Sequence, residues 1–229
     1  PFRRLRVRLR REIVSLGRPD VDAAADTGER VAPAEWNRLI ADPDTLVIDT
    51  RNGYEIDVGR FPGAVDPGTE SFRDFPAFVR GRLAGERDRP IAMYCTGGIR
   101  CEKATAMMRA MGFQRVYQLE GGILAYLDEM SDSPDNRWQG ECFVFDSRVA
   151  VDRRLAPGHY VQCHACRRPL SEEDVASPFY REGVSCPHCH GGIEPGRAER
   201  LAERRRQVEL AEARGERHIG AVYPAGEED

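Results

Sequence analysis

The sequence predicts an α/β fold in which a mostly parallel sheet carries helices on both faces. Short apolar runs typical of buried strands alternate along the chain with segments of helical character. The expected strands lie near 46–50, 63–65, 90–95 and 115–119, and the expected helices lie near 72–84, 101–111 and 121–130. Strand–helix alternation favours parallel pairing, with the helices covering both sides of the sheet. In such a sheet, ligands bind beyond the carboxyl ends of the strands.

Composition sets the broad class. The 229 residues suffice for one large or two modest domains, and a hydrophobic fraction of 41% supports a core. No apolar stretch approaches the roughly 20 residues needed to span a bilayer, and no secretory signal is visible. We therefore expect a cytoplasmic protein without membrane contact. Four of the seven cysteines form two Cys-x2-Cys pairs, which indicates metal-binding thiols rather than a disulfide framework.

The first 30 residues have the character of the end of a truncated N-terminal domain followed by a polar linker. Seven arginines and one glutamate lie within residues 1–18. Arginines and aliphatic residues alternate there, so a strand would place the arginines on one face. The residues concerned are Arg4, Arg6, Arg8 and Arg10. Such a row suits the phosphates of RNA, and an edge strand with a solvated charged face is an equally weighted alternative.

The most informative segment joins the strand near 90–95 to the helix near 101–111. Cys95 ends the strand, and Thr96, Gly97, Gly98 and Ile99 form an expected anion-binding loop that leads to Arg100. Glycines let successive N–H groups point at one spot, and the helix N-terminus and Arg100 add positive charge. A thiol there should have a lowered pKa. We predict that Cys95 and Arg100 are catalytic, against the simpler alternative of a buried cysteine beside a structural turn.

The spacing of this loop narrows the chemistry. Four residues separate Cys95 from Arg100, one fewer than in the Cys-x5-Arg loop of cysteine phosphatases. The shorter loop resembles the active-site loop of rhodanese domains, which is sized to carry a sulfur atom on the cysteine. Further rhodanese-like motifs are Leu46–Arg51, Glu55 with Gly59–Val65, and Val116–Gly122. The resemblance implies a rhodanese domain over residues 31–130, with a doubly wound parallel sheet.

A second site is expected in the segment 131–196. Its two Cys-x2-Cys pairs are separated by nineteen residues and together offer four thiolates. The expected ligands are Cys163, Cys166, Cys186 and Cys189. Zinc prefers a tetrahedral shell of this kind, which leaves no open position and is therefore structural. An iron–sulfur cluster and a redox dithiol are the alternatives. Residues 197–229 are expected to form a charged helix and a disordered tail.

Several separate tracts resemble the tRNA uridine-34 hydroxylase family. They are Ile48–Glu55, Cys95–Ala104, Tyr117–Leu127 and Gly140–Asp146. The resemblance implies a ferredoxin-like N-terminal domain that residues 1–30 would end, a central rhodanese domain and a C-terminal cysteine-bearing segment. It also implies tRNA as the substrate, molecular oxygen as co-substrate, and a hydroxyl installed at C5 of the wobble uridine. The catalytic cysteine of the family corresponds to Cys95, and its loop matches Gly97, Gly98 and Arg100.

The residues themselves leave the oxygen chemistry open. No flavin or nicotinamide motif is present, and no 2-His-1-carboxylate metal site is apparent. A thiolate could add to C6 of uracil and make C5 nucleophilic, or oxidised sulfur on Cys95 could be the oxygen donor. Two other functions remain as alternatives. One is a sulfurtransferase that moves sulfane sulfur from thiosulfate or a persulfide, and the other is a non-catalytic adaptor that binds RNA or protein.

Overall fold

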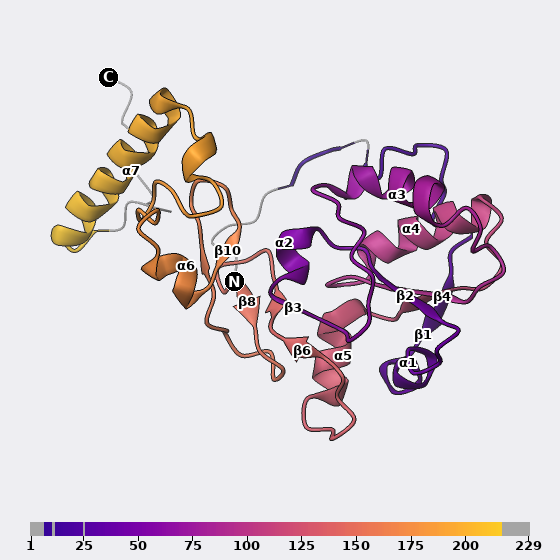
Figure 1. Cartoon of the computed structure of the whole chain (residues 1–229). Helices are drawn as coiled ribbons and strands as arrows, with labels where there is room; N and C mark the ends of the chain where they lie inside the picture. Colours follow the sequence, from indigo (N-terminus) through magenta and orange to yellow (C-terminus); the bar gives the residue numbers. More distant parts are fainter. Residues whose placement is uncertain (1–6, 11, 25, 217–229) are drawn as a thin grey trace. The chain divides into compact units, whose positions relative to one another are not determined.

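The computed structural model describes residues 7–10, 12–24 and 26–216 (Figure 1). These residues form two compact units, a larger one over 7–158 and a smaller one over 159–216. Residues 131–158 belong to the larger unit. The sequence pattern instead assigns them to the cysteine-rich segment 131–196. Among the described residues, no helix combines the length and the apolar character that crossing a membrane requires.

The centre of the larger unit is a four-stranded sheet in which every pairing is parallel. The strands are β1 (Glu29–Val31), β2 (Leu46–Asp49), β4 (Ile91–Tyr94) and β5 (Val116–Leu119), in the order β1-β5-β4-β2. Strand β4 lies between β5 and β2, and all four of its residues are fully buried. The mostly parallel sheet expected from strand–helix alternation is confirmed.

Helices cover both faces of this sheet (Figure 1). They are α1 (Pro33–Leu39) and α5 (Gly122–Met130) on one face, and α3 (Phe75–Arg82) and α4 (Ile99–Ala110) on the other. Successive side chains of a strand point to opposite faces. Met93 therefore packs with α3 and α4, while Tyr94 packs with α1 and α5. The core on the α1–α5 face is aromatic, with Phe61 at 4.9 Å from Tyr94 between ring centroids.

Shorter elements complete the larger unit. They are α2 (Gly53–Ile56), β3 (Gly59–Arg60), the 3-10 helix η1 (Phe72–Asp74), β6 (Gln139–Gly140), β7 (Cys142–Phe143) and β8 (Ala150–Val151). β3 pairs with β6 and β7 pairs with β8, both antiparallel. The strand expected near 63–65 is reduced to a single bridge between Val65 and Ile48.

Two expectations for the N-terminal region differ from the structure. The segment 19–30 is not only a linker, because its end enters the sheet as β1 beside β5. The strand expected through Arg4, Arg6, Arg8 and Arg10 does not form in its described part. Residues 7–10 are exposed and belong to no strand. Arg4 and Arg6 lie outside the described residues.

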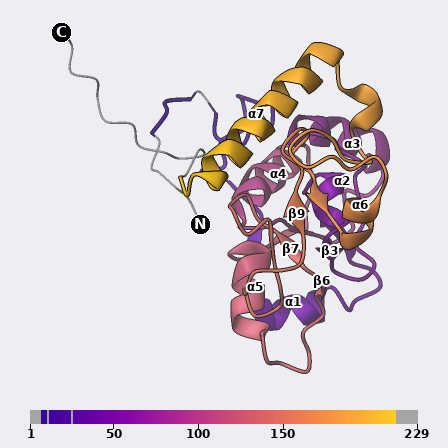
Figure 2. The same cartoon turned by 90° about the vertical axis from the view of Figure 1, so that its left-hand side faces the viewer.

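The smaller unit is built around the cysteine pairs. Its elements are β9 (Val161–Gln162), β10 (Pro169–Leu170), α6 (Glu172–Ala176), the 3-10 helix η2 (His190–Gly192) and α7 (Pro195–Ala213). β9 and β10 form an antiparallel pair. α7 is one continuous helix (Figure 2). It carries an ion pair between Arg205 and Glu209, with 2.9 Å between nitrogen and oxygen.

A buried ion pair anchors the end of β2. The Arg51 guanidinium donates to both carboxylate oxygens of Asp49, with a shortest distance of 2.6 Å, and both side chains are at most 1% exposed. The remaining donors of Arg51 reach the carbonyl oxygens of Glu55 at 3.1 Å and Gly59 at 2.6 Å. The guanidinium also lies 5.3 Å from the ring centroid of Trp138. Arg51 therefore fastens β2 to α2 and β3.

We predict that Arg51→Met lowers the free energy of unfolding by about 3–5 kcal/mol, because it leaves the Asp49 carboxylate buried without its partner. The double variant Asp49→Asn, Arg51→Met should lose less than the single variant, since it removes both charges. Both tryptophans are buried in this unit, so their fluorescence during urea unfolding reports its stability. A loss below about 1 kcal/mol for Arg51→Met would contradict this account.

Candidate functional site

Cys95 lies directly after β4, at the carboxyl edge of the sheet, and is 2% exposed. The loop Thr96–Gly98 turns the chain from β4 into α4, which begins at Ile99. Gly98 has φ of +85°, a conformation that favours glycine. Its N–H donates to Cys95 Sγ at 3.1 Å. The expected loop thus brings a backbone donor onto the thiol.

The first residues of α5 hydrogen-bond to the backbone of this loop. The Ile123 N–H donates to the carbonyl oxygen of Cys95 at 2.9 Å, and the Leu124 N–H donates to that of Thr96 at 3.1 Å. A Cβ atom on Gly122 would lie 2.5 Å from the Cys95 carbonyl oxygen and 2.7 Å from the Gly98 nitrogen. Glycine is therefore required at position 122, which explains the Gly-Gly turn after β5.

The surroundings of Cys95 lower the pKa of its thiol to about 6. The largest cause is a hydrogen bond from the Cys101 thiol, followed among the lowering effects by the charge of Arg100, while burial opposes both. Burial and the neighbouring Cys95 raise the pKa of Cys101 well above its ordinary value. The pKa values of the two thiols therefore differ widely. Cys95 is a thiolate at neutral pH, whereas Cys101 keeps its proton and can donate a hydrogen bond.

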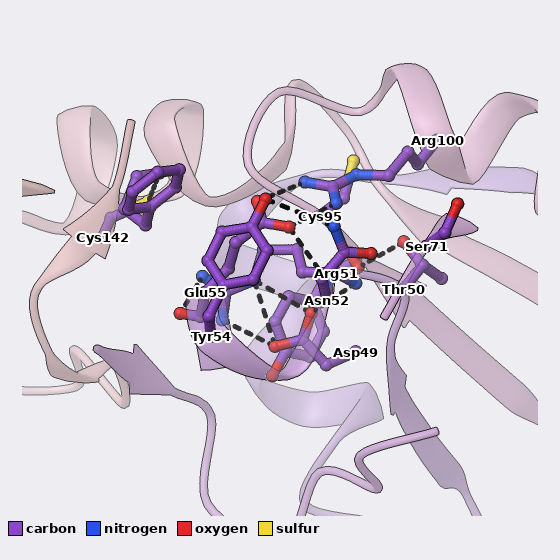
Figure 3. Close-up of polar contacts among 12 residues, drawn as sticks. Asp49, Thr50, Arg51, Asn52, Tyr54, Glu55, Ser71, Cys95, Arg100 and Cys142 are labelled. Atoms are coloured by element: carbon purple, nitrogen blue, oxygen red, sulfur yellow. Dashed lines mark hydrogen bonds and ion pairs between the residues drawn. The ribbon is translucent and has the colours of Figure 1, made fainter. Parts of the chain in front are cut away.

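Arg100 is held by Glu55 rather than left free for an anion. Its guanidinium donates to the two carboxylate oxygens of Glu55 at 2.6 and 2.8 Å, and the Glu55 side chain is fully buried (Figure 3). Glu55 also accepts from the Asn52 N–H at 2.9 Å. Bidentate pairs of this kind fix geometry as well as charge. Arg100 is therefore a fixed positive charge beside Cys95, and the sequence did not assign this role to Glu55.

A cleft of about 480 Å³ opens above Cys95. Its walls are mainly apolar and come from separate parts of the larger unit, with Thr96, Gly97 and Asn52 as neighbouring polar groups. The apolar side chains are Val14, Phe72, Ile99 and Phe145. A cleft of this size can take a small organic ring. Phe145 was not among the expected site residues, because it follows β7, far along the chain from the loop.

The remaining cysteine of this unit differs from Cys95 in its environment. Cys142 is fully buried and belongs to β7, whereas Cys95 follows β4 (Figure 3). Burial raises the pKa of its thiol to about 12. A thiolate is the nucleophilic form of cysteine. Of the cysteines in the larger unit, Cys95 is therefore the one prepared for nucleophilic chemistry.

The four cysteines of the smaller unit converge, with all four sulfur atoms within 4.8 Å of one another. Sγ–Sγ distances are 3.9 Å between Cys163 and Cys189, 3.7 Å between Cys166 and Cys186, and 3.6 Å between Cys186 and Cys189. A tetrahedral zinc ion at about 2.3 Å from each sulfur gives edges of about 3.8 Å, whereas a disulfide needs about 2.05 Å. The cluster therefore has the dimensions of a metal site.

Two nearby histidines have other partners. His188 Nε2 lies 3.0 Å from a carboxylate oxygen of Asp174. His190 stacks on Phe179, with 3.9 Å between the ring centroids. The cluster that could hold a metal ion, among the residues that the structure describes, consists of the four cysteines without a histidine.

We predict that the alkylation rate of Cys95 by iodoacetamide rises with pH through a midpoint near 6, because only the thiolate reacts. Cys101→Ala removes the main donor and should raise this midpoint, whereas Cys101→Ser keeps a hydroxyl donor and should leave it close to that of the original protein. The rate is followed by mass spectrometry of the Cys95 peptide. A midpoint near 8.5, as in a free cysteine, would contradict the proposed environment.

Comparison with known proteins places this site in a family. Residues 32–129 match the rhodanese-like domain. The chain is 55% identical over 222 residues to the tRNA uridine(34) hydroxylase of Mesorhizobium japonicum. The aligned region covers 96% of this chain and 72% of that protein. The chain is 54% identical to the same-named protein of Sinorhizobium fredii, covering 96% and 70%. For the protein of Acaryochloris marina, the identity is 50% and the coverage 97% and 72%. The chain therefore belongs to the tRNA uridine(34) hydroxylase family and contains a rhodanese-like domain.

Proposed function

We propose that this protein is an oxidoreductase that hydroxylates uridine 34 of tRNA at C5, with Cys95 as the reactive group and molecular oxygen as co-substrate. Relatives at 50–55% identity over most of the chain carry the name tRNA uridine(34) hydroxylase. The observation that carries the proposal is a thiol whose pKa is lowered to about 6 beneath a mainly apolar cleft of about 480 Å³. The wobble base lies in a single-stranded loop, so its ring can enter such a cleft.

The first chemical step is addition of the Cys95 thiolate to C6 of the uracil ring. The new S–C6 bond takes its electron pair from sulfur, and the C5–C6 π electrons move toward the C4 carbonyl. C5 then attacks one oxygen of a hydroperoxide, the O–O bond breaks, and the other oxygen leaves as hydroxide. Forming the hydroperoxide from molecular oxygen takes two electrons and two protons from an external thiol reductant, which is a required co-substrate of this proposal. Loss of the C5 proton and departure of the thiolate restore the aromatic ring and free Cys95. The Gly98 N–H and the Arg100 charge favour the thiolate as attacking and leaving group.

A sulfurtransferase is the second candidate, since the Cys95 loop lies in the segment that matches the rhodanese-like domain. A sulfur donor such as thiosulfate is small and doubly charged. The guanidinium nearest to Cys95 is already paired with Glu55, and the cleft walls are mostly apolar. These features favour an uncharged ring over a dianion.

The substrate backbone needs positive charge outside the cleft. Arg8 and Arg10 are exposed, and with Arg4 and Arg6 of the same alternating tract they are proposed to contact tRNA phosphates. With tRNA as its substrate, the enzyme is proposed to act in the cytoplasm.

The metal of the cysteine cluster is proposed to be zinc, in a structural role. Four thiolates at tetrahedral spacing suit zinc, and the closed shell leaves no position for substrate. Cys163 and Cys186 are buried among the few apolar side chains of the smaller unit, such as Leu170. Metal binding would therefore supply much of the folding free energy of a unit with a small core.

The catalytic proposal predicts that the purified full-length protein converts uridine 34 of tRNA to 5-hydroxyuridine when oxygen and a thiol reductant are both supplied. Cys95→Ser should abolish the product, because it removes the thiolate, while Cys142→Ser should retain it. Products are measured by mass spectrometry of tRNA nucleosides. If tRNA stays unmodified while the protein turns over thiosulfate rapidly, the sulfurtransferase function is correct instead.

The zinc proposal predicts one tightly bound zinc ion per chain in protein purified without added metal. The double variant Cys163→Ser, Cys189→Ser should lose the ion and unfold residues 159–216, leaving tryptophan fluorescence of the larger unit unchanged. His190→Gln is the matched control and should keep the ion, because His190 stacks on Phe179 instead of joining the cluster. Elemental analysis provides the measurement. Full metal retention in the double variant would refute the ligand assignment.

A further inference from the structure

Phe145 is an exposed aromatic side chain at the mouth of the Cys95 cleft. It is 59% exposed, although phenylalanine is usually buried. It follows β7 and therefore lies outside residues 32–129, the segment that matches the rhodanese-like domain. The chain thus adds an aromatic wall to a cleft whose floor belongs to that domain.

The turn between β7 and β8 holds Phe145 in place. The Val144 N–H donates to the Val149 carbonyl oxygen at 2.8 Å, which closes the turn. Arg148 pairs with Asp146 within the turn, at 2.7 Å. Val149 has φ of +65°, a costly conformation for a β-branched residue. Strain of this kind persists only where the surrounding contacts impose it. The turn that carries both Val149 and Phe145 is therefore held in one conformation, which fixes the position of Phe145.

The Phe145 ring lines the cleft and also contacts two neighbours. It meets Phe143 at a near-right angle, with 5.1 Å between ring centroids. The Arg100 guanidinium lies 5.9 Å from the ring centroid. Phe145 therefore contacts the same arginine whose charge acts on Cys95. Ile99 also lines the cleft and is 52% exposed. An aromatic and an aliphatic side chain therefore flank the entrance above a thiolate.

The chemistry of these walls selects the ligand. An aromatic face binds a nucleobase by stacking, whatever the base. An anion gains little here, because the Arg100 charge is already shared with Glu55 and Cys95. An uncharged planar ring can make apolar contacts with the walls. If one of its carbons is electrophilic, the buried thiolate can attack it.

We propose that Phe145 stacks on the uracil ring of uridine 34 and places its C6 against Cys95 Sγ. The inference rests on the proposed function, and it adds a substrate-binding residue from outside the rhodanese-like segment. Phe145 makes the cleft selective for a base and so separates this enzyme from a plain sulfurtransferase.

The test compares three substitutions of Phe145 in the full-length protein. Phe145→Ala should raise the KM for tRNA about ten- to a hundredfold, which corresponds to the loss of one base stack. Phe145→Trp keeps an aromatic face and should remain close to the original protein, whereas Phe145→Leu fills space without a face and should resemble the alanine variant. Phe179→Ala is the matched control, because Phe179 is 50% exposed in the smaller unit, and it should leave KM unchanged.

A second readout separates this inference from the proposed reaction. An RNA hairpin with uridine 34 in its loop should protect Cys95 from iodoacetamide, and the same hairpin with an abasic position 34 should not. Phe145→Ala should lose this protection while the reactivity of Cys95 without RNA stays unchanged, which shows an intact fold. Protection without hydroxylation would uphold the stacking and refute the reaction. Equal protection in the alanine and original proteins, or full rescue by leucine, would overturn the inference.

Discussion

The buried ion pair between Glu55 and Arg100 is the interaction on which the site depends. It joins α2 to the first turn of α4, directly beside the thiol of Cys95. A single partner removed from such a pair leaves an uncompensated buried charge, which is strongly destabilising. Because Glu55 holds Arg100 with two hydrogen bonds, the positive charge stays close to the sulfur. The pair therefore fixes the geometry of the loop and adds to the thiolate character of Cys95, for which the Cys101 thiol is the largest cause.

A second pair supports the first. Arg51 donates hydrogen bonds to the Asp49 carboxylate and to the Glu55 carbonyl oxygen. The two ion pairs are therefore connected, from the end of β2 through α2 to the cysteine loop. Two arginines and two carboxylates cancel formally. The Cys95 thiolate adds a further negative charge, which Arg100, the Gly98 N–H and the Cys101 thiol stabilise. These three groups keep Cys95 in the thiolate form, which is the nucleophilic form of cysteine.

Much of this arrangement could be predicted from local sequence. The strand–helix alternation, the Gly-Gly turn at Cys95 and the paired cysteines each depend on residues close together in the chain, and the structure contains all three. Strand β1 was missed because Glu29 and Arg30 are exposed at the sheet edge and show no apolar run. The partnership of Arg100 with Glu55, the donor role of Cys101 and the place of Phe145 depend on tertiary contacts, which spacing does not reveal.

The central claim is that Cys95 carries out chemistry on the wobble base of tRNA. The most direct measurement is mass spectrometry of tRNA nucleosides from cells that lack this protein, complemented with the original gene or with the Cys95→Ser variant. The account predicts that 5-hydroxyuridine at position 34 falls in the deletion strain, returns with the original gene and stays absent with the variant. Restoration of the nucleoside by Cys95→Ser would contradict it.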